Sequence, residues 1–273
     1  MAADPELAAS CRDLVQVYDS ASGPVHALRG VSADIPARSM TAVVGPSGAG
    51  KSTFLRLLAC LERPTVGEVT IHGQPTAHLG GRARRRIVAK QIGYIFQQPA
   101  DNLLDYLSVA EHVRMAWRMR QPETAGQVPA LLEMTDLVKL SPLRPGDLSA
   151  GEQQRLAFAM AVAGRPALVI ADEPTASLDP AGAQALIDLL PALVEDGQSL
   201  VICTHDRAVV DAADQVLAVS SGTLAATGVG GGELFAVIDD AGRIQLPSDL
   251  TRLFPGGRAR IVTLDHHLRV EPP

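Results

Sequence analysis

The segment Gly45–Thr53 constrains the fold of this chain more than any other stretch. It reads Gly-Pro-Ser-Gly-Ala-Gly-Lys-Ser-Thr and fits the phosphate-binding pattern Gly-x-x-x-x-Gly-Lys-Ser/Thr. The residues just before it, Thr41–Val44, are apolar and β-branched, which favours a buried strand. The residues after it, from Phe54 onward, can form a helix. Strand, glycine-rich loop and helix are the context that this pattern requires, so an α/β core is expected.

The chemistry of this loop predicts a site for a polyphosphate and a metal ion. Glycines let consecutive backbone N–H groups turn inward around an anion, and the following helix adds its positive end. Lys51 is expected to place a full charge on the β- and γ-phosphates, and Ser52 to ligate Mg²⁺. The chain has only three lysines, so a lysine at this position is unlikely to be there by composition alone.

The composition narrows the classes of partner. A net charge of −6 argues against a general nucleic-acid binder, although local basic patches stay open. The three cysteines are scattered, which suits a reducing cytoplasm and gives no disulfide framework. No apolar run approaches the length of a membrane span, and the acidic N-terminus lacks the order of a signal peptide. Any work at a membrane is therefore expected to go through a separate partner, without direct insertion.

The N-terminal part predicts an antiparallel sheet. Residues 8–36 alternate apolar and polar side chains, which indicates two strands joined through Asp19–Pro24. Tyr18 ends the first strand, and two interpretations stay open: an aromatic platform for a base ring, or an edge-strand tyrosine. Farther along, the basic cluster Arg82–Arg86 is interpreted as a solvated face.

Three apolar strands end in polar residues. The first is followed by Gln97, whose neutral amide can ligate a metal and orient water, or simply make a polar turn. The second ends in Asp172, which can reach Mg²⁺ through water, and Glu173 beside it can accept a proton from an attacking water. The third ends at His205, and a histidine there is expected to lie in the site. These strands are predicted at 92–96, 167–172 and 198–204.

The pattern becomes helical from about residue 102 to 165, which indicates an inserted helical subdomain. Ser149, followed three residues later by Glu152, predicts a capping box, and the same serine hydroxyl and first-turn amides also predict a second anion site. Asp179 and Pro180 are expected to start a later helix. The predicted helices span 109–119, 128–134, 152–163 and 180–195.

The C-terminal part changes in style. A hairpin over 216–228 is followed by a glycine-rich segment at 229–232, interpreted as a flexible linker. Residues 233–273 then predict a small, mainly-β module with a closing hairpin after residue 258. His266 and His267 are adjacent in its turn, without a third ligand, so a metal site is not expected there.

In their order and approximate spacing, these motifs over residues 8–228 resemble the ATP-binding subunit of ABC transporters. The resemblance implies an α/β fold, in which a P-loop NTPase core carries an N-terminal antiparallel β subdomain and an inserted α-helical subdomain within a domain spanning 1–228. Two short strings look most like the lipoprotein-releasing, macrolide-exporting and FtsE-type branch. The motifs are the loop at 45–53, Gln97, Leu148–Arg155, Leu168–Pro174, Ser177–Asp179 and His205, and the two strings are Ala171–Thr175 and Ile95–Gln98.

The resemblance also implies ATP and Mg²⁺ as cofactors and gives each matching residue a role. Tyr18 is similar to the residue that stacks on adenine, and the triphosphate binders are matched by Gly45, Pro46, Ser47, Gly48, Ala49, Gly50, Lys51, Ser52 and Thr53. The implied metal ligands are Ser52, Gln97 and Asp172, and the implied catalytic residues are Glu173 as general base with His205, Gln97 and Lys51. The residues implied to face a second subunit are Ser149, Gly151 and Asp179.

The function implied is ATP hydrolysis that couples the closure of a homodimer to a separate membrane permease, at the cytoplasmic face of the membrane. An FtsE-like ATPase that regulates a cell-envelope process without moving cargo is the alternative. A soluble ABC ATPase acting on ribosomes or DNA is disfavoured, because the chain has neither a second nucleotide domain nor a long coiled-coil insertion. A regulatory protein with the tail as effector is the remaining class.

Three departures from the family pattern bear on these expectations. Ala150 stands where a glycine is usual, and it preserves the phosphate contact only if its φ is negative. Glu152 stands where glutamine is also common, and Met160 replaces a common arginine, which removes an ion pair. Residues 234–271 resemble an AbrB-like swapped-hairpin module, whose acids and bases nearly balance here, so dimerisation or regulation is expected rather than DNA binding.

Overall fold

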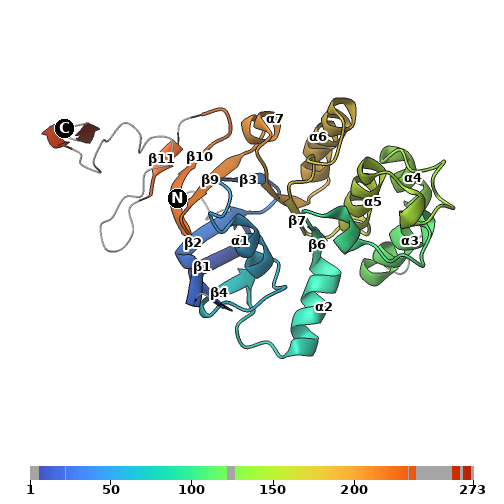
Figure 1. Ribbon diagram of the computed structural model, residues 1–273, viewed down its shortest axis with the longest axis horizontal. Helices are drawn as coiled ribbons and strands as arrows, with labels where there is room; N and C mark the ends of the chain where they lie inside the picture. Colours follow the sequence, from blue (N-terminus) through green and yellow to red (C-terminus); the bar gives the residue numbers. More distant parts are fainter. Residues whose placement is uncertain are drawn as a thin grey trace.

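A computed structural model describes residues 6–21, 23–121, 127–232, 234–237, 260–264 and 267–271 of the chain. Its centre is a seven-stranded sheet in the order β11-β10-β9-β3-β8-β7-β6 (Figure 1). The five strands from β9 to β6 run parallel, β10 is antiparallel to β9, and β11 is antiparallel to β10. The strands span Met40–Val44 (β3), Ile92–Ile95 (β6), Leu168–Asp172 (β7), Ser199–Cys203 (β8), Gln215–Ser220 (β9), Thr223–Gly228 (β10) and Leu234–Ala236 (β11).

A smaller antiparallel sheet lies on one side of the central sheet, with helix α1 (Lys51–Leu58) packed between them (Figure 1). The two faces of the central strands follow the strand alternation. Val43, Ile170 and Val201 pack with α1, whereas Ala42 and Ile202 pack with the helices on the opposite face. The strands of the smaller sheet, in the order β2-β1-β4-β5, span Gly23–Pro36, Leu7–Ser20, Val66–Ile71 and Gln74–Pro75.

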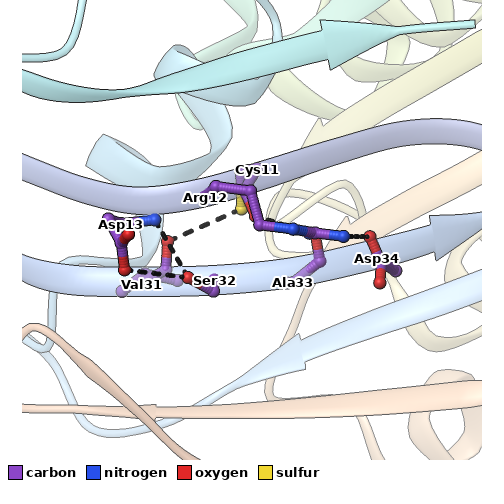
Figure 2. A network of polar contacts seen from close by, with 7 residues as sticks. All are labelled: Cys11, Arg12, Asp13, Val31, Ser32, Ala33 and Asp34. Carbon is purple, nitrogen blue, oxygen red and sulfur yellow. Dashed lines mark hydrogen bonds and ion pairs between the residues drawn. The ribbon is translucent and has the colours of Figure 1, made fainter. Parts of the chain in front are cut away.

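A bulge in β1 changes which residues face inward. Asp13 adopts φ 50°, and the pairing of β1 with both neighbours shifts at this point. Figure 2 shows Arg12 reaching across to Asp34, with its Nη2 2.7 Å from the carboxylate, while the Asp13 N–H donates to Ser32 Oγ. The buried series Ala9, Cys11 is replaced beyond the bulge by Leu14, Gln16. Tyr18 continues the second series, so the bulge decides to which face this tyrosine points.

The expected helical stretch forms between β6 and β7. It contains a helix capped by a Ser108–Glu111 box, a shorter second helix, and a third that begins with the Ser149–Glu152 box predicted from the sequence. Helix α2, whose exposed face carries the basic cluster, precedes β6 and was not assigned a secondary structure from the sequence. The helices span Gly81–Gln91 (α2), Val109–Arg120 (α3), Val128–Met134 (α4), Ala150–Val162 (α5), Pro180–Glu195 (α6) and Arg207–Asp211 (α7), with short 3₁₀ turns at Pro99–Asn102 (η1) and Pro145–Asp147 (η3).

Arg120, at the end of α3, ties the helical stretch to the central sheet. Its Nη1 donates to the carbonyls of Met160 and Ala163 at 2.9 and 2.7 Å, and its Nη2 donates to Ile92 O at 3.0 Å. Burial lowers the pKa of Arg120 to about 10, which still leaves it charged at neutral pH. Met160 stands where an arginine is common in the family. The buried cation bonded to this part of α5 is instead Arg120, which comes from α3.

The glycine-rich segment after β10, expected from its composition to be a flexible linker, is bonded to the loop after α7. The Gly230 N–H donates to Ala213 O at 2.9 Å, and a Cβ at Gly230 would lie 2.3 Å from Val210 O. Strand β11 then pairs with β10 and extends the central sheet, whereas the sequence placed it in the separate module. The closing hairpin forms from β12 (Arg260–Leu264) and β13 (His267–Glu271). The expected turn at 239–242, strand at 243–246 and helix at 247–254 lie outside the described residues.

Candidate active site

The carboxyl ends of four parallel strands bring the predicted site residues to one edge of the central sheet. In the pairing register, Asp172 lies beside Cys203, and Cys203 lies beside Val43 at the entrance to the glycine-rich loop. His205 follows β8 by two residues, and Gln97 follows β6 by two residues. Loops that leave the same edge of a parallel sheet converge, which is why residues distant in sequence meet here.

The glycine-rich loop wraps around the ammonium group of Lys51. Its Nζ donates to the carbonyls of Gly45 and Pro46 at 2.7 and 3.0 Å, and only 8% of the residue is exposed. Gly50 precedes α1 with φ 100°, and a Cβ there would lie 2.4 Å from Ala27 O, so only glycine fits. The loop therefore presents a charge and a helix N-terminus to the same small space.

Two carboxylates stand at the end of β7 in different environments. Asp172 is buried, with 4% exposed, and Glu173 is partly buried in the left-handed conformation, with φ 52°. The Glu173 N–H donates to Cys203 O at 2.9 Å, which fixes this unusual backbone geometry. Burial raises the pKa of Glu173, and the His205 charge acts in the opposite direction. A carboxylate with a raised pKa is suited to accept a proton.

His205 contacts Glu173 through both its backbone and its ring. Its N–H donates to Oε2 at 3.3 Å, and its Nε2 lies 3.3 Å from Oε1. The His205 side chain is 63% exposed, whereas that of Glu173 is 14% exposed. The histidine thus covers the carboxylate on the open side of the site.

The loop that carries Gln97 is anchored by hydrogen bonds on both sides of this residue. Asn102 accepts from Phe96 N–H at 2.9 Å and donates to Tyr94 O at 2.7 Å. The Leu104 N–H donates to Nε2 of the buried His112 at 2.8 Å. Gln97 itself is exposed between these anchored points, so its side chain is available to a ligand at the sheet edge.

Tyr18 reaches toward α1 from the smaller sheet. Its hydroxyl donates to Glu62 Oε2 at 2.5 Å, and the side chain is partly buried. Glu62 follows the end of α1, and its Oε1 lies 3.6 Å from Arg56 Nη1. The structure thus places this tyrosine beside the helix of the phosphate loop, with its hydroxyl already bonded.

The Ser149 turn is remote from the phosphate loop of the same chain. Figure 1 shows α5 and α1 well separated, with β6 and β7 between them. Ser149 N–H donates to Glu152 Oε2 at 2.7 Å, and the Glu152 N–H donates back to Ser149 Oγ at 3.3 Å. Ala150 is the first helical residue and has no positive φ, so it satisfies the condition under which its N–H keeps the direction of a glycine's. One chain therefore does not bring Ser149 and Gly151 to its own phosphate loop.

Asp179 lies at the start of α6, and it accepts from Gly182 N–H at 2.9 Å as the predicted cap. The loop before it lies against the Ser149 turn, because a Cβ at Gly151 would lie 3.4 Å from Ser177 O. These two segments therefore lie side by side.

Comparison with known proteins decides the family. The family model described as "ABC transporter" matches residues 28–176, which is more than half of the chain. The chain belongs to the ABC transporter family. It is the ATP-binding, ATP-hydrolysing part of such a transporter, and the fold expected from the resemblance is confirmed.

The ABC cassette extends over most of the chain. Lipoprotein-releasing system ATP-binding protein LolD 2 of Caulobacter vibrioides is 38% identical, over 81% of this chain and 97% of that protein. Macrolide export ATP-binding/permease protein MacB of Rhodospirillum rubrum is 36% identical, over 85% of this chain and 34% of that protein. A dimeric structure of the ATP-binding cassette MJ0796 in a post-hydrolysis state, bound to ADP and Pi, superposes with a TM-score of 0.77 at 30% identity, covering 82% of this chain and 100% of that one.

Some residues that support the site were not predicted from the sequence. Asn102 and His112 anchor the Gln97 loop, and Glu62 holds Tyr18. Each has a partner that is in another element or loop, so no short motif marks it. The Ser108–Glu111 capping box, in contrast, follows the local pattern Ser-x-x-Glu and can be read from the sequence.

Proposed function

We propose that two copies of this chain sandwich two ATP molecules, each held by the Lys51 loop of one copy and the Ser149 turn of the other. The observation that carries this proposal is the separation of the two segments within one chain (Figure 1), although each is built to receive phosphate. Neither segment alone surrounds a triphosphate, so ATP binding would draw two copies together. Asp179 and its loop, beside the Ser149 turn, would lie at that interface.

The donor set fits a magnesium ion. The Asp172 carboxylate, the Ser52 hydroxyl and the Gln97 amide oxygen are hard oxygen ligands, and the carboxylate is buried at the end of β7. When bound, the metal ion would neutralise charge on the phosphate oxygens. Lys51 would bind the β- and γ-phosphates, Glu173 would take a proton from the attacking water, and His205 would contact the γ-phosphate. In this proposal, Tyr18 stacks on the adenine ring.

We place the membrane partner at the surface formed by the Gln97 loop and α3. Here the exposed apolar side chains of Tyr106 and Met119 lie on the helical subdomain, and a hollow of about 450 Å³ is lined by Glu111, Arg114, Met115, Arg118 and Met119. None of the helices formed by the described residues is long and apolar enough to cross a bilayer. Two relatives are named as a lipoprotein-releasing system ATP-binding protein and a macrolide export ATP-binding/permease protein. These names support a separate permease as the partner of this chain, and a place at the inner face of the membrane.

The proposed reaction is tested with Glu173→Gln. The variant should lose ATP hydrolysis and accumulate an ATP-bound dimer, because closure no longer leads to turnover. Steady-state ATPase assays and size-exclusion chromatography with ATP would measure both effects. Glu195→Gln, an exposed residue at the end of α6, is the matched control and should leave both unchanged. Normal hydrolysis by Glu173→Gln would refute the base assignment.

Two further proposals concern the branch of the ABC family to which the chain belongs and the role of its C-terminal residues 233–273. LolD- and MacB-type relatives support the lipoprotein-releasing, macrolide-exporting and FtsE-type branch, and co-purification of an integral membrane protein with or without transported cargo would separate a transporter from an FtsE-like regulator. The AbrB-like module of residues 233–273 is proposed to dimerise or regulate. The antiparallel β12–β13 hairpin supports a β module. Salt-sensitive, submicromolar binding of the tail to duplex DNA would contradict this role.

A further inference from the structure

Glu62 occupies a position that the nucleotide-binding motifs do not describe. It follows α1, whose first residue is Lys51, and its side chain faces Tyr18 on one side and Arg56 on the other. The Glu62 side chain is 31% exposed and that of Arg56 is 45% exposed, so the group lies at the rim of the site, where water still reaches it.

The contact between Tyr18 and Glu62 has the geometry of a strong hydrogen bond. The phenol oxygen lies 2.5 Å from Glu62 Oε2, within the short range of O–H donors to carboxylates. Burial and the bond to Glu62 raise the pKa of Tyr18, whereas a hydrogen bond with Thr53 acts in the opposite direction. The hydroxyl is therefore protonated at neutral pH, and it donates.

The second oxygen of the Glu62 carboxylate has a partner of its own, which sets the orientation of the carboxylate. Arg56 Nη1 lies 3.6 Å from Oε1, so the carboxylate is held between a cation and a phenol. All three members are carried by rigid parts of the molecule: Arg56 by α1, Glu62 by the turn after it, and Tyr18 by β1 beyond the bulge. The orientation of the tyrosine ring is thus tied to the same helix that begins at the phosphate loop.

We propose that Glu62 is a positioning residue for nucleotide binding, which holds the Tyr18 ring in the orientation that receives the base of a nucleoside triphosphate. The inference rests on the proposed function, in which Tyr18 stacks on the base. A free tyrosine would have to be ordered at each binding event, and a ring held in advance removes that cost. The effect concerns the base and leaves the phosphate contacts of Lys51 untouched.

The test compares a ligand that has a base with one that does not. Equilibrium dissociation constants of the full chain are measured for ATP and for inorganic tripolyphosphate. Glu62→Ala should weaken ATP binding between about two- and tenfold, the range expected for ordering one side chain, and leave tripolyphosphate binding unchanged. In hydrolysis, the loss should fall on KM, with kcat retained. Glu62→Gln, which keeps a neutral acceptor, should recover part of the affinity for ATP.

Tyr18→Phe tests the same bond from its other end. A ring that stacks without being held loses nothing when its hydroxyl is removed, whereas a ring held by Glu62 should lose as much ATP affinity as in Glu62→Ala. The double variant should then be no weaker than either single variant. Glu68→Ala, an exposed carboxylate on β4, is the matched control and should bind both ligands as the wild type does.

The outcomes separate this inference from the proposed function. Failure of the wild type to bind ATP would overturn both. If the wild type binds ATP, the inference is overturned by an unchanged ATP affinity in Glu62→Ala, or by equal losses for ATP and tripolyphosphate, which would place the effect on the phosphate loop. Should Glu62→Ala fail to fold, Tyr18→Phe and the double variant Tyr18→Phe/Glu62→Gln take its place. The inference is then overturned by an unchanged ATP affinity in Tyr18→Phe, or by additive losses of ATP affinity in the double variant.

Discussion

The edge of the central sheet that carries Lys51 and the Ser149 turn are both proposed to bind phosphate, but they are constructed differently. At the sheet edge, parallel strands buried on both faces bring together Asp172 at the end of β7 and the loop after β3 that leads to Lys51. At the Ser149 turn, one exposed helix start is held by its own capping box. The first half of the site is assembled by the fold, and the second by a few consecutive residues.

In the proposed dimer, this difference gives each half of the composite site a different task. A half-site made of strand ends cannot be moved without unfolding the sheet, so it suits the tight binding of a nucleotide. A turn on a separate group of helices can be presented to another molecule as a unit. Arg120 is the point at which those helices are bonded to the start of β6, the strand that leads to Gln97.

The largest expected effect comes from changing one residue in each half. Lys51→Ala should weaken ATP binding by about 100-fold, roughly 2.7 kcal/mol, because a charged donor to the phosphates is lost. Ser149→Asp should leave ATP binding by the separate subunit within about twofold, since aspartate also caps a helix, but should abolish ATP-driven dimerisation and hydrolysis through repulsion of the triphosphate. Calorimetric titration and light scattering would measure the two effects.

The control for this comparison is Ser149→Asn, which caps the helix without a charge. It should retain more dimerisation than Ser149→Asp. A mixture of Lys51→Ala and Ser149→Asp subunits should regain ATP-driven pairing, because one mixed site has both intact halves. The composite site would be ruled out if the Ser149→Asp subunit alone lost its affinity for ATP as strongly as Lys51→Ala does.

The same contrast explains what the sequence could predict. That Gly45–Thr53, Asp172 and His205 lie at one edge of the sheet could be predicted, because each stands at a fixed offset from an apolar strand and the strands are parallel. Ser149 was found because a capping box is written in four residues. Arg120 was not found, since its acceptors are backbone carbonyls 28 to 43 residues away and carbonyls carry no sequence signal.

The order of the strands was also beyond the sequence. Nothing local indicates that β3 lies between β8 and β9, or that β11 extends the central sheet after the glycine-rich segment. Glycine composition predicted flexibility at 229–232, whereas the absence of a Cβ at Gly230 serves a close approach to the backbone of α7 and the loop after it. The same residue type fits both uses, and only the tertiary neighbours tell them apart.

Arg120→Met tests the hydrogen bonds that join the helical stretch to the central sheet. Three carbonyls lose a charged donor, and the expected cost is about 2–4 kcal/mol of the free energy of unfolding, measured by urea denaturation. Arg118→Met, an exposed arginine on the same helix, is the matched control and should cost less than about 0.5 kcal/mol. Equal losses in the two variants would mean that the bonds of Arg120 do not hold the helices to the sheet.

The smallest effect expected is a pH dependence confined to the helical side. His112 is fully buried, its Nε2 accepts from Leu104 N–H, its Nδ1–H donates to Ser108 O, and burial lowers its pKa. The folded state therefore favours the neutral ring, while the unfolded state takes up a proton below about pH 6.5. Stability should be full above that pH and fall as the pH is lowered, by at most about 1.4 kcal/mol per pH unit. Urea denaturation at pH 7.5 and 5.5 would measure this slope in the wild type and in His112→Gln, which keeps an acceptor and a donor but does not titrate. The variant should lose part of the slope, and an identical slope in both proteins would remove His112 as its source.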